Sequence, residues 1–392
     1  MLGTASAPVR LLYRSSLVIF LVTIVIGILN GLDLWEPPRE ILLTHVHAGT
    51  LGWITLAIIG FAISMFEGDR GDDPGTLRLA QAAVGATVLY MVAFATGTGI
   101  FRPIAGTLEL LAIVWALAWV IGRWRSAPRT IAGLSMMLAM VSLTIGAVLG
   151  VLLGLFIANG ELPGMDADTA GSLAGAHPPA MLVGYLILAV MAVTEWQLAD
   201  RPQASSESRS GLVMAVGLFL AGVAFNLAFI LDVDALIQVA TLLEVAGVVI
   251  FVVRMWGNVA PAAWKDASKA YPQLATVWLA AGVGLLVYLV QLFISGAIDP
   301  EAGEGTNIII AFDHTMFMGA TTNALFGAVG AGALAAGTRR GVMYGVNVGL
   351  VVFVAGLLAD STALKMIGSP VMGFALLWGI YALLTAKADA AA

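Results

Sequence analysis

The chain has 392 residues, of which 60% are hydrophobic and 11% charged, and its formal net charge is −6. These proportions exclude an ordinary soluble domain, in which about 25% of the residues are charged. Cysteine is absent, which excludes thiolate-ligated heme, iron–sulfur clusters, thiolate zinc sites and disulfides.

Apolar stretches long enough to cross a bilayer recur along the whole chain. A spanning helix needs roughly 20 mostly apolar residues, and twelve such stretches are present. In chain order we expect helices at 11–31, 42–66, 79–100, 104–122, 130–157, 174–196, 211–231, 235–255, 272–296, 307–334, 342–359 and 366–386. No small-residue cleavage pattern follows the first, so it is interpreted as a retained helix. The sequence therefore predicts an all-α integral membrane protein.

The basic residues are divided unevenly between the two sides of the predicted bundle. With twelve spans, fifteen of the eighteen Lys and Arg residues fall on the side that holds both termini, and only Arg39, Arg102 and Lys365 fall opposite. Cytoplasmic loops carry an excess of Lys and Arg. We therefore predict cytoplasmic N- and C-termini in a bacterial-type inner (plasma) membrane.

Four histidines, His45, His47, His177 and His314, lie near the starts of the second, sixth and tenth predicted helices. The interval is 130 residues from His47 to His177 and 137 residues from His177 to His314, about a third of the chain each. A neutral imidazole is a standard ligand for heme iron and copper. The spacing therefore predicts a heme or metal site, with these four residues as candidate ligands.

The same spacing indicates a repeated unit of four helices within a single transmembrane domain. The three copies cover approximately 11–122, 130–255 and 272–386, and we expect them to form three pseudo-symmetric four-helix arcs. An even number of helices preserves orientation, so the histidine of each copy would lie at a similar depth in the bilayer.

Glycines support this repeat unequally. Gly52 follows His47 by five residues, and Gly319 follows His314 by the same interval. The middle copy, with Gly184, is a looser match. Chains rich in alanine and glycine produce chance matches of this kind, so the glycines add weight only because they agree with the histidine spacing.

Glu109 in the fourth predicted helix and Glu244 in the eighth are acidic residues inside apolar spans, 135 residues apart. No acid occupies the matching place in the twelfth helix, near Met372. Intramembrane acids are costly and often mark proton or ion paths. The alternative is a protonated acid hydrogen-bonded between helices, and Asn226 and Gln291 are the other polar groups expected inside the bundle.

His45 and His47 are separated by about 200° of helical rotation, so they face nearly opposite ways and cannot chelate one metal. One of them can instead hydrogen-bond a carbonyl or a loop. His177 precedes Pro178-Pro179, which suits the first turn of a helix, and its alternative role is capping.

The cations on the side opposite the termini can pair with the propionates of a heme. Arginine binds carboxylates bidentately, so Arg102, together with Lys365, is predicted to contact the cofactor. For Arg39 we favour interfacial snorkelling.

Short motifs around the histidines resemble those of heme–copper oxidase subunit I. Residues 45–53, HVHAGTLGW, resemble the His-x-His-x-Gly-x-Leu-Gly-Trp run of the C-family oxidases, which there lies on helix 10. Residues 176–178, AHP, resemble the start of helix 6, and residues 311–314, AFDH, resemble the histidine run of helix 10. The resemblance implies twelve helices in three arcs, with ligands toward the outer face. The pattern is also similar to the NnrS family of twelve-helix heme proteins.

The resemblance implies a low-spin heme b between His47 and His314. It departs from the family elsewhere: Phe312 replaces the ligand of the high-spin heme, and 217–231 lacks the histidine pair that binds copper. Met181 stands in place of the cross-linked tyrosine. One heme site is therefore expected without a standard binuclear centre.

We accordingly predict a membrane b-type hemoprotein with an electron-transfer or nitric oxide-related role. Its expected partners are the lipid bilayer, an electron-donor protein or quinol, and a small gas, but no nucleic acid. One alternative is an active nitric oxide or oxygen reductase, with a second heme or copper at His45 and His177. Another is a transporter that moves protons or ions through Glu109 and Glu244.

Overall fold

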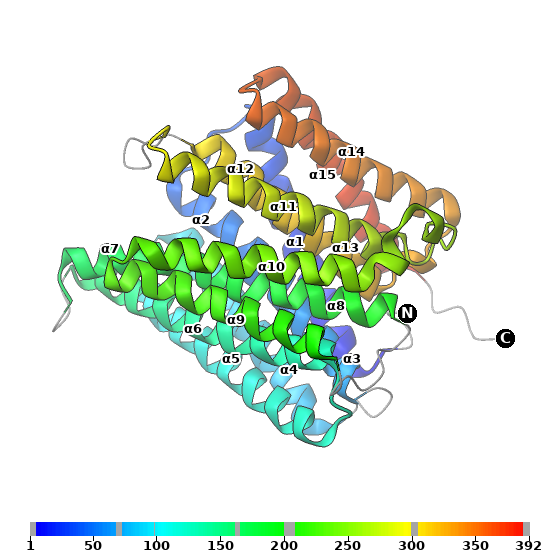
Figure 1. Ribbon diagram of the computed structural model, residues 1–392, viewed down its shortest axis with the longest axis horizontal. Helices are drawn as coiled ribbons and strands as arrows, with labels where there is room; N and C mark the ends of the chain where they lie inside the picture. The colour runs from blue at the N-terminus through cyan, green and yellow to red at the C-terminus, as the bar shows by residue number, and fades with distance from the viewer. Residues whose placement is uncertain are drawn as a thin grey trace. The chain divides into compact units, whose positions relative to one another are not determined.

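The computed structural model describes residues 5–67, 73–97, 99–160, 165–199, 208–298 and 305–386 (Figure 1). Every regular element in this described part is helical. Eleven of its helices are long and apolar enough to cross a membrane. The chain is thus an all-helical, multi-pass membrane protein, as its composition predicts.

The predicted tenth span is the helix over 306–329, and it is not one of these eleven. It has the length of a span, but Asp313, His314 and Asn323 lower its mean hydropathy. Twelve helices are therefore present near the twelve predicted places, while apolarity alone supports only eleven as spans.

The helices follow one another in sets of four, and the second helix of each set contains a π-helical segment. The first set is α1 (Ala7–Gly31), α2–η1–α3 (Arg39–His47, Ala48–Thr55, Leu56–Glu67), α4 (Pro74–Thr96) and α5 (Phe101–Ser126). The second set is α6 (Ile131–Asn159), α7–η3–α8 (Ala167–Pro179, Ala180–Ile187, Leu188–Leu198), α9 (Arg209–Leu231) and α10 (Asp234–Val259). The third set is α11 (Ala270–Ile294), α12–η5–α13 (Thr306–His314, Thr315–Thr321, Thr322–Val329), α14 (Ala336–Leu358) and α15 (Thr362–Thr385). Short 3₁₀ turns, η4 (Pro261–Ala263) and η6 (Ala331–Ala333), lie in connections.

Local sequence explains where many of these helices begin and end. Asp73 caps α4 by accepting from the Thr76 N–H at 3.1 Å, and Thr130 caps α6 in the same way. Gly97 and Gly160 follow α4 and α6 with positive φ values of 67° and 77°, a conformation that glycine adopts without steric cost.

The structure corrects the position of His177. Its helix begins at Ala167 rather than near 174, so His177 lies well inside the helix and Pro178-Pro179 are interior residues. Proline has no N–H to donate to the preceding turn. The helix continues through the π segment η3 directly after the prolines.

In the third set, side chains stabilise the π segment. The Thr321 and Thr322 hydroxyls donate to the carbonyls of Met316 and Phe317, each five residues earlier and at 2.8 Å. Carbonyls left without an i+4 partner at the change from π to α geometry thereby gain donors. π segments are rare and often occur at functional sites.

The chain divides into two compact units, which we describe separately. In the unit made of 16–54 and 256–386, the fully buried Trp53 stacks on Phe20 with ring centroids 4.8 Å apart and meets Phe326 edge-on. The helices α14 and α15 pack along their lengths there (Figure 1). In the unit made of 5–15 and 55–255, α6 packs against α5, α7 and α8.

Candidate functional site

The π segments define two equivalent positions at which the histidines lie. The position three residues before the segment is held in the three sets by His45, His177 and Phe312. The position directly before the segment is held by His47, Pro179 and His314. The structure therefore matches His177 with His45, rather than with His47 as the even spacing suggested.

A glycine at the fifth place of each π segment marks a close contact with the preceding helix. The three pairs are Gly52 with Ile19, Gly184 with Ser142, and Gly319 with Trp278. A Cβ on Gly184 would lie 3.0 Å from Ser142 Cβ, and one on Gly319 would lie 2.7 Å from Trp278 Cγ. The middle glycine thus has the same role as the other two.

A second set of contacts lies one turn further along the preceding helix. The pairs are Thr23 with Gly49, Gly146 with Met181, and Gly282 with Met316. In each pair the second residue of the π segment contacts the preceding helix. The residue contacted there lies four positions after the one that contacts the glycine at the fifth place of the segment. We call these three helix pairs, α1 with α2–η1–α3, α6 with α7–η3–α8, and α11 with α12–η5–α13, the first, second and third hairpins.

His45 and His177 bind the preceding helix in the same way. The Nδ1 atoms hydrogen-bond the carbonyl oxygens of Thr23 and Gly146 respectively, both at 2.9 Å. Four residues later the preceding helix has Gly27 and Gly150, where an added Cβ would lie 3.2 Å and 3.0 Å from the histidine Cε1. These glycines make room for the imidazole rings. In the third hairpin Phe312 and Leu286 stand at the matching places.

His47 and His314 hydrogen-bond their own helix instead. Their Nδ1 atoms pair with the carbonyl oxygens of Leu43 at 2.7 Å and Ile310 at 2.9 Å, each one turn earlier. His314 also packs on Phe353 of α14, with ring centroids 4.9 Å apart. All four imidazoles are half-buried.

These bonds fix the tautomer of each ring. A carbonyl oxygen only accepts, so Nδ1 carries the proton and the lone pair lies on Nε2. Histidines that ligate metals usually donate their other N–H to a carbonyl or carboxylate. The expected alternative, a histidine bound to a carbonyl, is therefore present for all four residues and is compatible with ligation through Nε2.

The structure brings together His45 and His314 from distant parts of the chain. Their imidazoles are close enough to interact electrostatically. His47 is two residues from His45 on the same helix and points about 200° away. The interaction seen here is between His45 and His314, whereas the family resemblance implied a pair of His47 with His314.

Chelation by protein groups alone has no support in the described residues. Among them, no group of three or more His, Cys, Asp or Glu side chains could hold a metal ion. A heme differs because the porphyrin supplies four nitrogens, and the protein need supply only one or two axial ligands.

The predicted cationic residues have protein partners. Arg102 donates to the carbonyl oxygen of Phe94 at 3.2 Å and lies over its ring, while the Arg102 Nε atom has no hydrogen-bond partner among the described residues. Lys365 pairs with Asp360 at 3.4 Å. Arg39, the first residue of α2, is exposed.

Glu109 and Glu244 are both buried but differ in their contacts. Glu109 accepts hydrogen bonds from the Thr87 hydroxyl at 3.1 and 3.2 Å. Neither carboxyl oxygen of Glu244 has a partner among the described residues. Asn226 is also buried, and its Oδ1 likewise has no partner there.

Two contacts near the π segments were not anticipated from the sequence. Trp53 Nε1 donates to the Thr322 hydroxyl at 3.2 Å, and the Tyr185 hydroxyl pairs with that of Thr55 at 2.9 Å. In both, an aromatic residue at the sixth place of one π segment meets a threonine at the eighth place counted from the start of another. Only the glycine spacing in the sequence pointed to this shared register.

Ion pairs at the far end of the π-containing helices were also not anticipated. Arg123 contacts Glu67 at 2.6 Å in the first set, and Arg254 contacts Glu195 at 2.6 Å in the second. Each joins the second helix of a set to the fourth. The basic residues counted for topology thus also connect helices.

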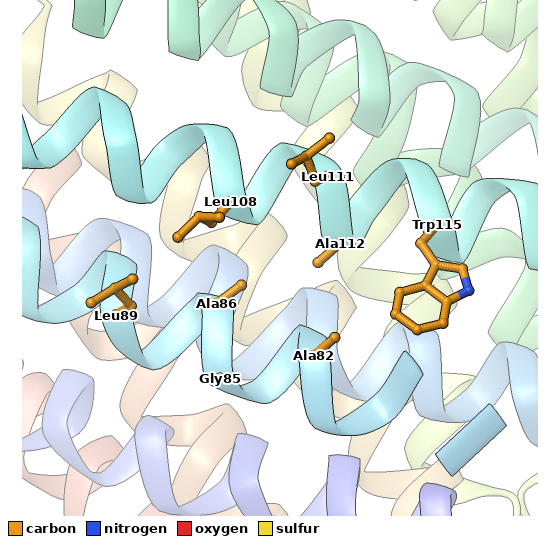
Figure 2. Close-up of a pocket in the computed structure, with 8 residues that line it drawn as sticks. All are labelled: Ala82, Gly85, Ala86, Leu89, Leu108, Leu111, Ala112 and Trp115. Atoms are coloured by element: carbon orange, nitrogen blue, oxygen red, sulfur yellow. The ribbon is translucent and has the colours of Figure 1, made fainter. Parts of the chain in front are cut away.

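An apolar groove of about 310 Å³ lies between α4 and α5 (Figure 2). Its lining residues are Ala82, Gly85, Ala86, Leu89, Leu108, Leu111, Ala112 and Trp115. No histidine lines it, and the Glu109 carboxyl, which belongs to the same helix, hydrogen-bonds Thr87 instead. The groove is therefore separate from the candidate ligand site.

No protein-family model matches the chain, and no curated protein matches it.

Proposed function

We propose that the chain is a membrane-embedded b-type hemoprotein with a bis-histidine heme and an electron-transfer or nitric oxide-related role. The observation that carries the proposal is the electrostatic interaction between His45 and His314, two imidazoles from helices far apart in sequence. Each has its Nδ1 held by a carbonyl oxygen, which leaves the Nε2 lone pair as the ligand atom.

The donor set fits a heme. His45 packs over Gly27, where a larger residue would displace the ring, and His314 is positioned by Phe353. When bound, heme supplies a one-electron iron couple, and two axial imidazoles favour electron transfer over gas binding. The residues of this chain would hold the iron, fix the imidazole tautomers and exclude lipid from the site.

We further propose that the twelve helices form three four-helix arcs. The repeated contacts support this: two kinds of pair recur between the first and second helices of all three sets, and the histidine–carbonyl pair recurs in the first and second sets. The Trp53–Thr322 and Tyr185–Thr55 pairs follow one rule of register. The proposed membrane orientation, with both termini cytoplasmic, still rests on the charge distribution.

The proposal keeps the expectation that a standard heme–copper centre is absent. Phe312 occupies the position that His45 and His177 hold in the other hairpins. In the reductase alternative, His45 and His177 bind a second metal. This alternative conflicts with the proposed heme ligation, because His45 would then have to ligate both the heme and the second metal. Copper or non-heme iron in proportion to heme would favour the reductase.

The experiment is a pyridine hemochrome assay and an absorbance spectrum of protein purified from heme-replete cells. We expect a low-spin b-type spectrum that collapses in His45→Ala and in His314→Ala. His47→Ala is the matched control, because it lies on the same helix and should keep the spectrum.

Two other outcomes are informative. Loss of the spectrum in His47→Ala and not in His45→Ala would restore the ligand pair implied by the family resemblance. Wild-type protein that is folded but contains no heme, and that conducts protons or cations in liposomes, would replace the heme proposal with the transporter alternative.

A further inference from the structure

Glu244 is a buried carboxyl group in apolar surroundings. It is 1% exposed in α10, and the buried residues one turn before and after it are Ala240, Gly247 and Val248. On the facing helix α9, Leu218 fills the space beside Gly247. The carboxyl therefore sits in the apolar packing of the α9–α10 pair.

No described group compensates a charge on this carboxyl. Both oxygens lack hydrogen-bond partners among the described residues, and no charged side chain of that part of the chain acts on the group. An ionised carboxylate in such surroundings costs several kcal/mol or more. The neutral acid, which holds its own proton, is the form compatible with this environment.

Glu109, in the fourth helix of the first set, is a buried acid that has a hydrogen-bond donor. It is 4% exposed and receives two contacts from the Thr87 hydroxyl. The contrast identifies Glu244 as the acid that lacks a structural partner.

A second acceptor without a partner among the described residues lies, along the helix axis, nearer to the α9–α10 turn than Glu244. The contact of Gly247 with Leu218 sets the register of α9 and α10, and with a rise of about 1.5 Å per residue Asn226 is nearer than Glu244 to the turn at Asp232. Asn226 is 7% exposed, and its Oδ1 has no partner among the described residues. Along the helix axes, Asn226 is therefore closer to the turn and Glu244 closer to the middle of the membrane.

We propose that Glu244 is a proton-binding site within the membrane, reached from the α9–α10 turn by way of Asn226. The ligand is the proton itself, carried on the carboxyl oxygen and exchanged with water that enters from the turn; the Asn226 amide hydrogen-bonds that water and does not itself take up the proton. This assignment needs no heme and stands or fails independently of the function proposed above.

Infrared spectroscopy of the full chain in lipid tests the proton on Glu244. A protonated carboxylic acid has a carbonyl stretching band distinct from that of a carboxylate, and the band shifts in heavy water. We expect one component of that band to be lost in Glu244→Gln and kept in Glu109→Gln. Both variants preserve side-chain shape, and unchanged elution on size exclusion verifies their fold. A protonated-acid band that is identical in wild type and Glu244→Gln overturns the proposal.

The route through Asn226 has its own measurement. Removing one hydrogen-bonding group of about 1 kcal/mol should slow a step roughly fivefold, so Asn226→Leu should slow deuterium exchange of the Glu244 band by about that factor. Ala224→Leu, on the same helix, is the control and should leave the rate unchanged. Equal exchange rates in wild type and Asn226→Leu would overturn the route.

Discussion

The first and third hairpins share a scaffold but differ at one chemically decisive position. Both pack a π-segment glycine on the preceding helix, Gly52 on Ile19 and Gly319 on Trp278. Three residues before the π segment, however, the first hairpin has His45 and the third has Phe312.

The comparison separates the π-segment glycine, which helix packing requires, from the position three residues before the segment, at which the side chain varies. The glycine is required wherever two helices approach closely, because any Cβ there would collide with a neighbour. The aromatic position accepts either ring, but its neighbour on the preceding helix changes with it: glycine lies beside His45 and His177, and Leu286 stands at the matching place beside Phe312. The exchange of imidazole for phenyl removes a ligand and keeps the π segment.

The largest expected effect comes from making the first hairpin like the third. His45→Phe should abolish the low-spin heme spectrum, since phenyl has no ligand atom. Stability should fall by roughly 1–3 kcal/mol, because phenyl is larger than imidazole and the bond from His45 Nδ1 to the Thr23 carbonyl is lost. Absorbance per mole of protein and the thermal midpoint measure the two effects. His47→Phe, the matched control, should retain the spectrum, and a His45→Phe protein with a full heme complement would contradict the ligand assignment.

The next effect tests the shared scaffold. Gly319→Leu should destabilise the protein by about 3 kcal/mol, near the upper end for overpacking. Trp278 cannot move aside easily, because its Nε1 donates to Asn347 at 2.6 Å. Thermal unfolding in detergent measures the loss.

The control for this substitution is Gly217→Leu in α9. A Cβ at Gly217 would meet nothing within 4 Å, so leucine there should leave stability nearly unchanged. Equal destabilisation by the two leucines would mean that the fifth place of the π segment has no special packing role.

A smaller effect is expected from making the third hairpin like the second. Phe312→His alone should cost roughly 1–3 kcal/mol, because Leu286 occupies the place that Gly150 keeps open beside His177. Adding Leu286→Gly should cost less in this background than in the wild type, with a coupling of about 1 kcal/mol. Unfolding free energies of the two single variants and the double variant measure this coupling. Strict additivity would show that the two positions do not share a site.

The positions of the helices could be predicted from the sequence because each is a long apolar stretch, and hydropathy reports length directly. The π segments could not, because a search for a 3.6-residue period assumes regular α geometry. This is why His177 was matched with His47: the histidines were aligned on each other, whereas the register is set by the segment after Pro179.

The candidate site was predictable in its residue types and less so in its pairing. Rotation showed that His45 and His47 face opposite ways, but which of them meets His314 depends on how distant helices pack. The Trp53–Thr322 bond, across 269 residues, is similarly invisible in the sequence. The unpaired state of Glu244 depends on its neighbours on α9, and no local pattern reports it.

The smallest expected effect on stability concerns the N-terminal cap of α7, at which the second hairpin differs from the other two. Asp166 caps α7 by accepting from the N–H and the hydroxyl of Thr169 at 2.9 and 2.7 Å. The corresponding residues of the other hairpins, Pro38 and Gly305, make no side-chain cap. Asp166→Ala should therefore lower the thermal midpoint slightly, and Asp166→Asn, which can still cap, should lower it less.

The charge on this cap gives the effect a defined pH dependence. The donors of Thr169 lower the pKa of Asp166 below its usual value. The ionised cap therefore stabilises the fold above the pKa of Asp166 in the unfolded chain, and this contribution is lost as the pH falls through the lower pKa in the folded protein. The difference in thermal midpoint between wild type and Asp166→Asn should be present at neutral pH and disappear in acid. A difference that persists at the lowest pH would show that the asparagine alters the cap geometry and not only its charge.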